Sequence, residues 1–369
     1  MTMRWIEGFE ARLHENLQAE TYGQDGTGGY GGVTTAGAGT AGRKIGKSLR
    51  VSDGATFTTP VLVPAASNTW IIQFAIRKGA GTNMAGGGFV KCVLNGSGTQ
   101  LEIRQVNGAR EGTWALEVFR GVTSLGQTQD YAYGGQRTWM CFQAEVVINT
   151  GTSGSVNIKA WDYFNNSTTA LNLTSQNTAD QGVAAMDQVI FALNDQLDSV
   201  EQWDDIVIMD NAGSVNNAQT AVPFLIFGAL PNGDGPTVDW DPSTGSTHWN
   251  LLASVATVSG NGEEVTSDTV TELEQFPFAD IPEMSDGGTP AIAGMMVDIH
   301  GAMKNSGTRT LRVNVDDPVG GNADVATDLI FSNLVLTART LIMETNPVSA
   351  VAWTLADLED HYIGFKLHA

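Results

Sequence analysis

Residues 202–210, QWDDIVIMD, are the stretch of sequence that decides the fold. Their apolar centre, residues 206–209, lies between Asp204 and Asp205 on one side and Asp210 on the other. A short apolar run bounded by carboxylates predicts a strand in the middle of a sheet that ends in a solvated turn. We therefore expect the chain before this strand to form one β-sandwich that closes on it. The chain after it should form a different unit.

The composition favours many short strands over long helices. The chain has 43 glycines among 369 residues and only 16% charged residues, a balance typical of strands joined by tight turns. Strand candidates follow one another at short intervals, separated by Asn-Gly and glycine-rich turns: residues 48–51, 70–77, 88–94, 100–106, 114–120, 139–148, 155–160, 189–193 and 203–209. About nine or ten antiparallel strands predict a large jelly roll of the concanavalin A type.

The pattern divides the chain into three parts. Residues 1–211 should form the concanavalin/laminin-G-like β-sandwich, and residues 212–282 an extended connecting arm. Residues 283–369 should form a small C-terminal β domain, with strand candidates at 291–299, 308–315, 329–336 and 339–343 before a short helix at 355–362. Thr354 and Asp357 occupy the positions of a capping box at the start of that helix.

The arm is the part of the chain in which we expect contacts with a neighbouring subunit. Its last segment, residues 263–282, is acidic and has little periodicity, and the contacts are expected there. The predicted interface residues are Glu272, Glu274, Phe276 and Phe278.

The charge balance excludes several classes of partner. The chain has 19 Lys and Arg against 40 Asp and Glu, a formal net charge of −21. Such a chain repels phosphate backbones and anionic lipid headgroups over roughly 8–10 Å at ordinary ionic strength. We expect no nucleic-acid partner and read the basic residues Arg43, Lys44, Lys47 and Arg50 as a solvated loop and strand edge. Since no window reaches ~18 uninterrupted apolar residues, we also expect no membrane insertion.

Two cysteines, Cys92 and Cys141, are too few for a disulfide framework. Each lies within an apolar run, so we expect two reduced thiols in the core, with a bridge between them as the alternative.

Several segments carry a resemblance to a known family. WIEGFE at residues 5–10, GRKIGKSL at 42–49, the strand at 71–77 and DDIVIMD at 204–210 together resemble the laminin-G/concanavalin-like lectin fold. The whole run, continued by LPNGDG at 230–235 and WDPSTGSTHW at 240–249, is similar in its order to a family of tailed-bacteriophage virion structural proteins.

The resemblance implies a non-enzymatic structural component of a phage particle, either a tail or fibre protein or a capsid decoration. Its sandwich would be displayed and its C-terminal unit would dock on the particle. The implied partners are other virion proteins and further copies of the chain, with a trimer for a fibre. The implied location is the virion, after synthesis in the host cytoplasm. The alternative functions are a carbohydrate-binding module that recognises host-surface glycans, and an unrecognised or degraded glycosidase.

The glycan-binding alternative directs attention to exposed aromatic residues. Tyr131 and Tyr133 lie in a glycine-rich loop, where we expect exposed rings that stack on a sugar or contact a protein. Trp114 and Trp139 begin apolar strands and are expected in the core, while Trp161 is a further candidate for a sugar-binding face.

The sequence shows no catalytic or metal-binding pattern. Glu272 and Glu274 are the best carboxylate pair for a glycosidase, but they lack the further carboxylates of the laminarinase-like motif. Oxygen ligands for Ca²⁺ are available at Asp204, Asp205 and Asp210, and more weakly at Asn232 and Asp234. The five histidines have no ligand spacing, so we expect no cofactor.

Overall fold

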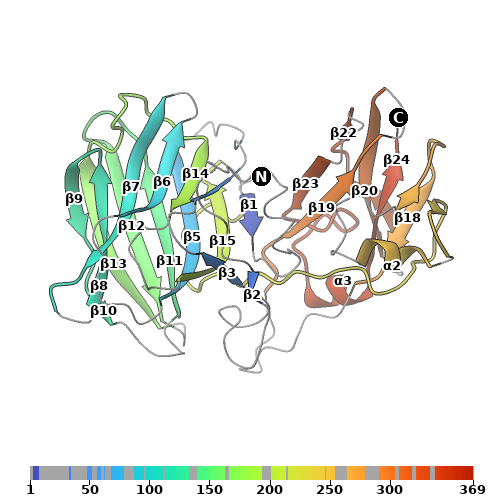
Figure 1. Cartoon of the computed structure of the whole chain (residues 1–369), viewed down its shortest axis with the longest axis horizontal. Helices are drawn as coiled ribbons and strands as arrows, with labels where there is room; N and C mark the ends of the chain where they lie inside the picture. The colour runs from blue at the N-terminus through green and yellow to red at the C-terminus, as the bar shows by residue number, and fades with distance from the viewer. Residues whose placement is uncertain are drawn as a thin grey trace. The chain divides into compact units, whose positions relative to one another are not determined.

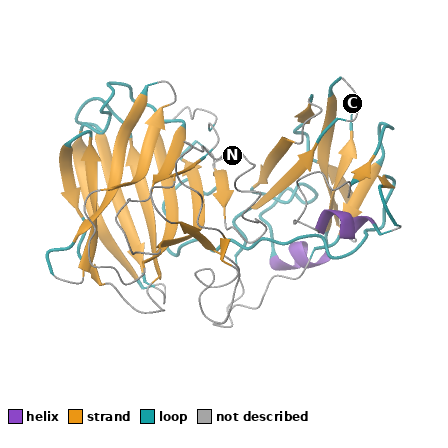
Figure 2. Ribbon diagram, viewed as in Figure 1, coloured by secondary structure: helices purple, strands orange, loops and turns teal. Residues whose placement is uncertain are grey.

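The fold is that of a computed structural model, which describes residues 3–7, 33–34, 48–51, 56–59, 62, 68–78, 87–94, 97–110, 113–132, 139–162, 166–192, 201–212, 215–245, 247–253, 264–278, 291–303, 307–317, 321–332 and 337–368. These residues form two compact units, 1–226 and 227–369. Both units are built almost entirely of antiparallel strands, which Figures 1 and 2 show as arrows. The all-β class predicted from the sequence is therefore confirmed.

The first unit is a β-sandwich of two antiparallel sheets (Figure 1). The eight-stranded sheet has the order β13 (Ser167–Gln176), β12 (Gly154–Trp161), β11 (Trp139–Val147), β5 (Thr69–Lys78), β15 (Glu201–Asp210), β3 (Ser48–Val51) and β2 (Val33–Thr34), with β1 (Met3–Glu7) paired to β15. The seven-stranded sheet has the order β10 (Tyr131–Ala132), β8 (Thr113–Arg120), β7 (Gly98–Asn107), β6 (Gly87–Leu94), β14 (Gln188–Ala192) and β4 (Thr56–Thr58), with β9 (Thr123–Gln127) paired to β8.

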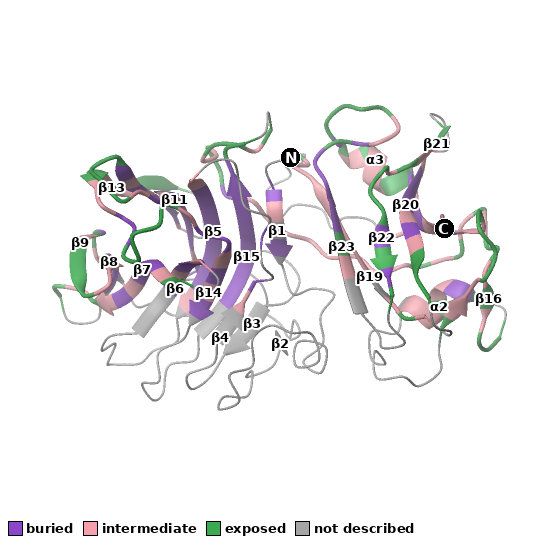
Figure 3. Cartoon of the chain, turned by 90° about the horizontal axis from the view of Figure 1, so that it is seen from above, coloured by how far each residue is buried: buried purple, intermediate pink, exposed green. Residues whose placement is uncertain are grey.

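The strand predicted to organise the chain is a central strand of the larger sheet. β15 pairs with β5, β3 and β1, and its apolar residues Ile206, Val207, Ile208 and Met209 are buried. Figure 3 shows β5 and β15 as the most continuously buried strands of this sheet. The flanking carboxylates differ from the prediction of a solvated boundary, because Asp204, Asp205 and Asp210 are buried as well.

The core between the two sheets is formed by alternate residues of each strand, as the twofold side-chain period of a strand requires. On β5 these are Trp70, Ile72, Phe74 and Ile76. Aromatic rings connect the two sheets, since the ring centroid of Phe142 on β11 lies 5.8 Å from that of Trp114 on β8. Inward-facing residues of the other sheet include Val90, Cys92, Leu101, Ile103, Trp114, Leu116, Val118, Val189 and Phe191.

The two cysteines are free and buried, which confirms the prediction of reduced core thiols. Cys92 belongs to the core between the sheets, whereas Cys141 belongs to a separate apolar cluster with Ala75, Trp139 and Trp161. Burial raises the pKa of Cys92 to about 12, so this thiol stays protonated at neutral pH.

The second unit contains a five-stranded sheet and shorter ribbons. The sheet has the order β18 (Leu273–Phe276), β24 (Tyr362–Leu367), β20 (Arg309–Asp317) and β21 (Gly321–Asp324), with β22 (Leu329–Phe331) paired to β20. β19 (Met295–Gly301) pairs with β23 (Thr337–Met343), and β16 (Asp241–Pro242) pairs with β17 (Val265–Thr266). The helices are α2 (His248–Ala253) and α3 (Leu355–Asp360).

The end of the chain differs in part from its prediction. The capping box of Thr354 and Asp357 is present at the start of α3, as expected. The helix stops at Asp360, His361 is its C-cap, and Tyr362, predicted as its last residue, begins β24 instead. The physical reason is the sheet, because β24 fills the position between β18 and β20 and satisfies the main chain of both neighbours.

The predicted arm is extended but does not form a separate part of the fold. Residues up to 226 belong to the first unit, and the described residues from 227 to 278 belong to the second, where they supply α2 and β18. No helix among the described residues has the length and apolar content needed to span a membrane.

Candidate functional site

The outer face of the eight-stranded sheet is covered by the chain itself. We call it the amide face, and we call residues 219–226, which cross it, the strap. Gln73 donates from Nε2 to the carbonyl of Phe224 (3.0 Å) and accepts from the amide of Phe224 (2.8 Å). Gln143 accepts from the amide of Thr220 (2.9 Å) and donates to its hydroxyl (2.7 Å). Each glutamine therefore binds one strap residue through both a donor and an acceptor.

Two further hydrogen bonds hold the strap on the same face beside the glutamines. Trp161 donates from its indole nitrogen to the carbonyl of Ala221 (3.2 Å), and Asp205 accepts from the amide of Ile226 (2.8 Å). Trp161 and Trp139 are both buried, which confirms the core position predicted for Trp139 and removes Trp161 from the candidates for a sugar-binding face. Along the strap, the polar groups of Gln73, Gln143, Trp161 and Asp205 are therefore bonded to the chain itself.

The predicted calcium ligands serve other purposes. Asp205 accepts from Ile226 and has φ of +50° at a bulge in β15. Asp210 accepts from Arg4 Nε at 2.5 Å and from the amide of Ala212. Asp234 accepts from the amide of Trp249 (2.7 Å). Within the described part of the chain, no group of three or more His, Cys, Asp or Glu residues is arranged to hold a metal ion.

The tyrosine predicted to bind glycans is part of the core. Tyr131 is buried, and its ring centroid lies 5.2 Å from that of Trp114 and 5.4 Å from that of Phe142. Burial raises its pKa to about 12. This prediction is therefore corrected, because Tyr131 offers no ring face to solvent, and Trp114 is in the core as predicted. Tyr133 lies outside the described residues.

The outer face of the seven-stranded sheet carries partly exposed charged and aromatic side chains. We call it the charged face and define it by Lys91, Glu102, Arg104, Glu117, Phe119 and Ser124. Their positions follow from strand alternation and register, because Lys91 lies opposite Glu102, Glu102 opposite Phe119, and Arg104 opposite Glu117. The inward neighbours of these residues are core residues, so the charged side chains point away from the core.

Arg104 is the centre of the charged face. Its guanidinium carbon lies 4.1 Å from the centroid of the Phe119 ring, in cation–π contact. Its Nε donates to Glu102 (2.6 Å) and its Nη2 to the carbonyl of Gly121 (3.1 Å). The Arg104 side chain is still 28% exposed. Because a guanidinium has five N–H donors in one plane, further donors remain for a ligand.

Two more contacts complete the charged face. Lys91 Nζ lies 3.9 Å from Glu102, with 32% of its side chain exposed. The hydroxyl of Ser124 donates to Glu117 at 2.5 Å. All hydrogen bonds and ion pairs described for this face stay within β6 to β9 and the turn after β8, in contrast to the amide face. The charged face can therefore offer donors, acceptors and a flat stacked pair to a ligand.

The residues predicted to form a subunit interface lie in or beside β18. Glu274 and Phe276 are buried inside the second unit, so neither is available to a neighbouring subunit. Glu274 accepts from the amide of Trp240 (3.0 Å) and lies 2.7 Å from Nδ1 of His248. Burial is the largest influence on Glu274 and raises its pKa, against the opposing effect of these two hydrogen bonds. Glu272 and Phe278 are partly exposed, and their role in an interface stays a prediction.

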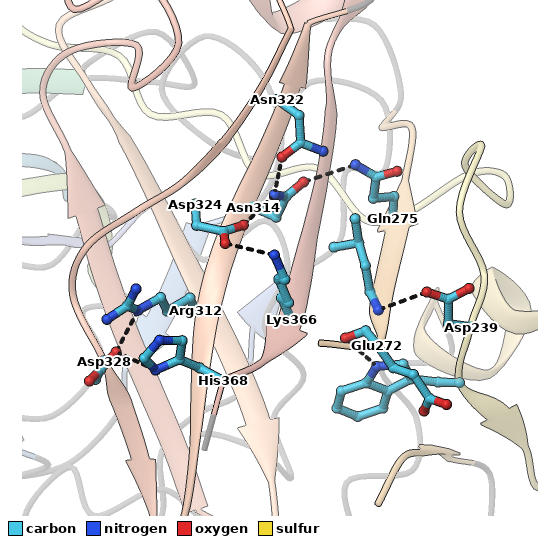
Figure 4. Close-up of polar contacts among 12 residues, drawn as sticks. Asp239, Glu272, Gln275, Arg312, Asn314, Asn322, Asp324, Asp328, Lys366 and His368 are labelled. Atoms are coloured by element: carbon cyan, nitrogen blue, oxygen red, sulfur yellow. Dashed lines mark hydrogen bonds and ion pairs between the residues drawn. The ribbon is translucent and has the colours of Figure 1, made fainter. Parts of the chain in front are cut away.

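The second unit has a polar sheet face of its own (Figure 4). The amide of Gln275 donates to Asn314 (2.9 Å), and Asn314 donates to Asp324 (2.7 Å). Gly364 lies between Gln275 and Asn314 in register, where a side chain would meet the neighbouring main chain. Lys366 donates to Asp324 at 2.9 Å. Burial acts to raise the pKa of Asp324, but the bonds from Lys366 and Asn314 outweigh it and lower the pKa.

A second ion pair lies on the same polar face (Figure 4). Arg312 Nε donates to Asp328 (2.6 Å), and Nδ1 of His368 lies 3.5 Å from the same oxygen. The hydrogen bond from Arg312 lowers the pKa of Asp328. No described aromatic ring stacks on Arg312, so this face lacks the stacked pair of the charged face.

Similarity to known proteins is limited to solved structures. No family model matches the chain, and no curated protein matches it. Solved structures that match include an alginate lyase from Aplysia kurodai (14% identity, TM-score 0.30, 44% of this chain and 82% of that chain). Others are the T. cruzi calreticulin globular domain (12%, 0.34, 56% and 87%) and the catalytic domain of a glycoside hydrolase family 131 protein from Coprinopsis cinerea (14%, 0.34, 56% and 94%).

These matches contradict two of the functional predictions. The chain was expected to be a structural component of a tailed-phage particle and not an enzyme, but the matches are to polysaccharide lyases, glycoside hydrolases and a calreticulin domain. Both predictions are withdrawn, although likeness at this level assigns no activity to this chain. The resemblance to phage proteins, the virion location, the virion partners and the homo-oligomer stay predictions.

The residues of the charged face were missed by the sequence analysis. Their signal is the alternation of charged and apolar residues in LEIR at 101–104 and LEVF at 116–119. This alternation predicts that Glu102, Arg104, Glu117 and Phe119 share the side of their strands opposite to Leu101, Ile103, Leu116 and Val118.

Proposed function

We propose that the β-sandwich binds carbohydrate on the charged face. The observation that carries the proposal is the Arg104 guanidinium lying 4.1 Å above the Phe119 ring, with carboxylates of Glu102 and Glu117 on the same face. Protein sites for small ligands combine an apolar or aromatic surface with a few placed polar groups. The charged face has both parts.

The chemistry of the face fits sugar hydroxyls. A hydroxyl both donates and accepts, so it can donate to a carboxylate while it accepts from a guanidinium or ammonium group. Ser124 already shows this use of Glu117, because its hydroxyl donates to the carboxylate at 2.5 Å. Bonds to charged partners are about twice as strong as neutral ones, which favours a hydroxyl-rich ligand over an apolar one.

Glycan-array screening followed by calorimetry tests the proposal. We expect wild-type protein to bind an oligosaccharide and Arg104→Ala to weaken that binding by about tenfold or more, the loss of one or two charge-assisted hydrogen bonds. Arg312→Ala is the matched control, because Arg312 also bonds a carboxylate at 2.6 Å and is 25% exposed, but lies in the second unit. Equal losses in the two variants, or no glycan bound by wild type, would overturn the proposal.

The same incubations report cleavage. Chromatography of the bound oligosaccharide after prolonged contact with the protein shows whether binding is accompanied by lysis or hydrolysis. Products that disappear in Glu117→Gln and Glu102→Gln would assign turnover to the charged face.

A further inference from the structure

We infer that the saccharide bound at the charged face is neutral and not a polyuronate or sulfated chain. This inference rests on the proposed function and names the ligand class of that site. It starts from the charges of the face, where Lys91 and Arg104 are matched in number by Glu102 and Glu117.

Both cations already share a carboxylate. Arg104 bonds Glu102 at 2.6 Å, and Lys91 lies 3.9 Å from the other oxygen of Glu102. Glu102 is only 14% exposed, so it has little water to replace a lost partner. To bind Arg104, the carboxylate of an anionic sugar would have to displace Glu102. The partly buried Glu102 carboxylate would then be left with a weaker hydrogen-bond partner. A hydroxyl needs no exchange, because it can use the remaining guanidinium donors.

Carboxylates also lie beside both ends of β8. In the turn before β8, Asp130 accepts a hydrogen bond from the main-chain amide of Arg110 (3.3 Å). After β8, a Cβ added at Gly121 would lie 2.7 Å from Asp180. Both carboxylates add negative charge near the ends of β8, which opposes the carboxylate or sulfate of a ligand.

The negative net charge of the whole chain also disfavours an anionic ligand. Its formal net charge is −21. Each uronate or sulfate added to a ligand is repelled by this field over about a Debye length, roughly 8–10 Å at physiological salt. A neutral chain has no such penalty, so its affinity should depend little on ionic strength.

Matched oligosaccharides test the inference. The probes are β-1,4-mannan and β-1,4-mannuronate oligomers of equal length, which differ in the carboxylate at C6, and the corresponding glucan and glucuronan pair. We expect calorimetry to show tighter binding of the neutral member by about tenfold at about 0.01 M salt, with a smaller difference at about 1 M salt, where the Debye length falls to about 3 Å.

A charge variant sharpens the test. Glu102→Gln keeps the side-chain shape but leaves Arg104 and Lys91 without their shared negative charge. We expect the ratio of the affinity for the uronate to the affinity for the neutral sugar to rise several-fold in this variant, because the positive charges of Arg104 and Lys91 become available to the uronate carboxylate. Arg312→Ala should leave the ratio unchanged, and a melting curve checks that each variant is folded.

The outcomes separate the two claims. Tighter binding of the uronate by wild-type protein, or an unchanged ratio in Glu102→Gln, would overturn the inference of a neutral ligand while the proposed function stands. Absence of binding to every oligosaccharide, neutral or acidic, would overturn the proposed function and this inference with it.

Discussion

The two outer faces of the β-sandwich both carry polar side chains in rows across neighbouring strands, but their partners differ. On the amide face, Gln73 and Gln143 bind the main chain of the strap. On the charged face, Arg104 bonds Glu102 and Ser124 bonds Glu117, within the face itself. The side chains of the amide face are bonded to the strap, whereas those of the charged face keep donors and acceptors for another molecule.

This difference has a chemical reason. A glutamine side chain carries both an acceptor oxygen and amide N–H donors, so it can bond both the N–H and the C=O of one residue, as a peptide group of a neighbouring strand does. A row of glutamines is therefore suited to hold a crossing segment whose main chain would otherwise lose its water partners. Burying a charged side chain costs more free energy than burying an amide, which favours keeping the charged row at the surface.

Trp161→Ala should give the largest difference between the two faces. Trp161 is fully buried under the strap, so its loss removes apolar packing and the bond to Ala221. We expect the free energy of unfolding of the first unit to fall by about 3–5 kcal/mol. Phe119→Ala on the charged face is the control, with an expected loss of about 1 kcal/mol. Urea denaturation followed by circular dichroism measures both, and similar losses would contradict the comparison.

Gln143→Ala should release the strap without emptying the core. The variant leaves the amide and the hydroxyl of Thr220 without Gln143 as their hydrogen-bond partner, which should lower the free energy of unfolding by about 1–3 kcal/mol. Hydrogen exchange at Thr220 and Phe224 should accelerate. Gln127→Ala, at an exposed position of β9, is the matched control and should leave both amides protected. Unchanged exchange in Gln143→Ala would show that the strap is held by other contacts.

Arg104→Ala should change stability much less than it changes binding. Arg104 and Glu102 are near the surface, and pairs of this kind contribute about 1 kcal/mol or less. We expect a melting temperature within a few degrees of wild type, measured by calorimetry on the variant used for the binding experiment. A large fall in melting temperature would identify Arg104 as a structural residue and would weaken the contrast between the faces.

We expect the smallest change in stability on the polar face of the second unit, where it should depend on pH. The pKa of Asp324 is lowered from its ordinary value of 3.8, so this carboxylate stabilises the fold above that pH and the contribution is lost as pH falls through the lowered pKa. Asp324→Asn should therefore be less stable than wild type at neutral pH, and the two should converge once the pH has fallen below the lowered pKa of Asp324. A difference that persists at lower pH would show that the effect comes from lost geometry and not from charge.

Much of the fold was predictable because its strands and turns depend on residues that are close together in the sequence. The alternation of apolar residues and the glycine-rich turns predict the antiparallel strands, and the buried run 206–209 confirms the central strand. The failures involve contacts between distant residues. Asp210 was expected in a solvated turn, but it bonds Arg4, 206 positions earlier in the chain. Tyr131 was expected to be exposed, but it packs against Phe142 of the opposite sheet.

The sequence by itself determined the all-β class, the strands, the reduced cysteines and the capped helix α3, because strand period, turn residues and caps act over a few neighbouring residues. The alternation at residues 101–104 and 116–119 also encodes that Glu102, Arg104, Glu117 and Phe119 share one side of their strands, although the sequence analysis missed this signal. Only the tertiary structure decided which outer face is covered. Residues 219–226 cross the sheet that carries Gln73 and Gln143, and this choice depends on hydrogen bonds between residues more than 70 positions apart, which no local pattern encodes.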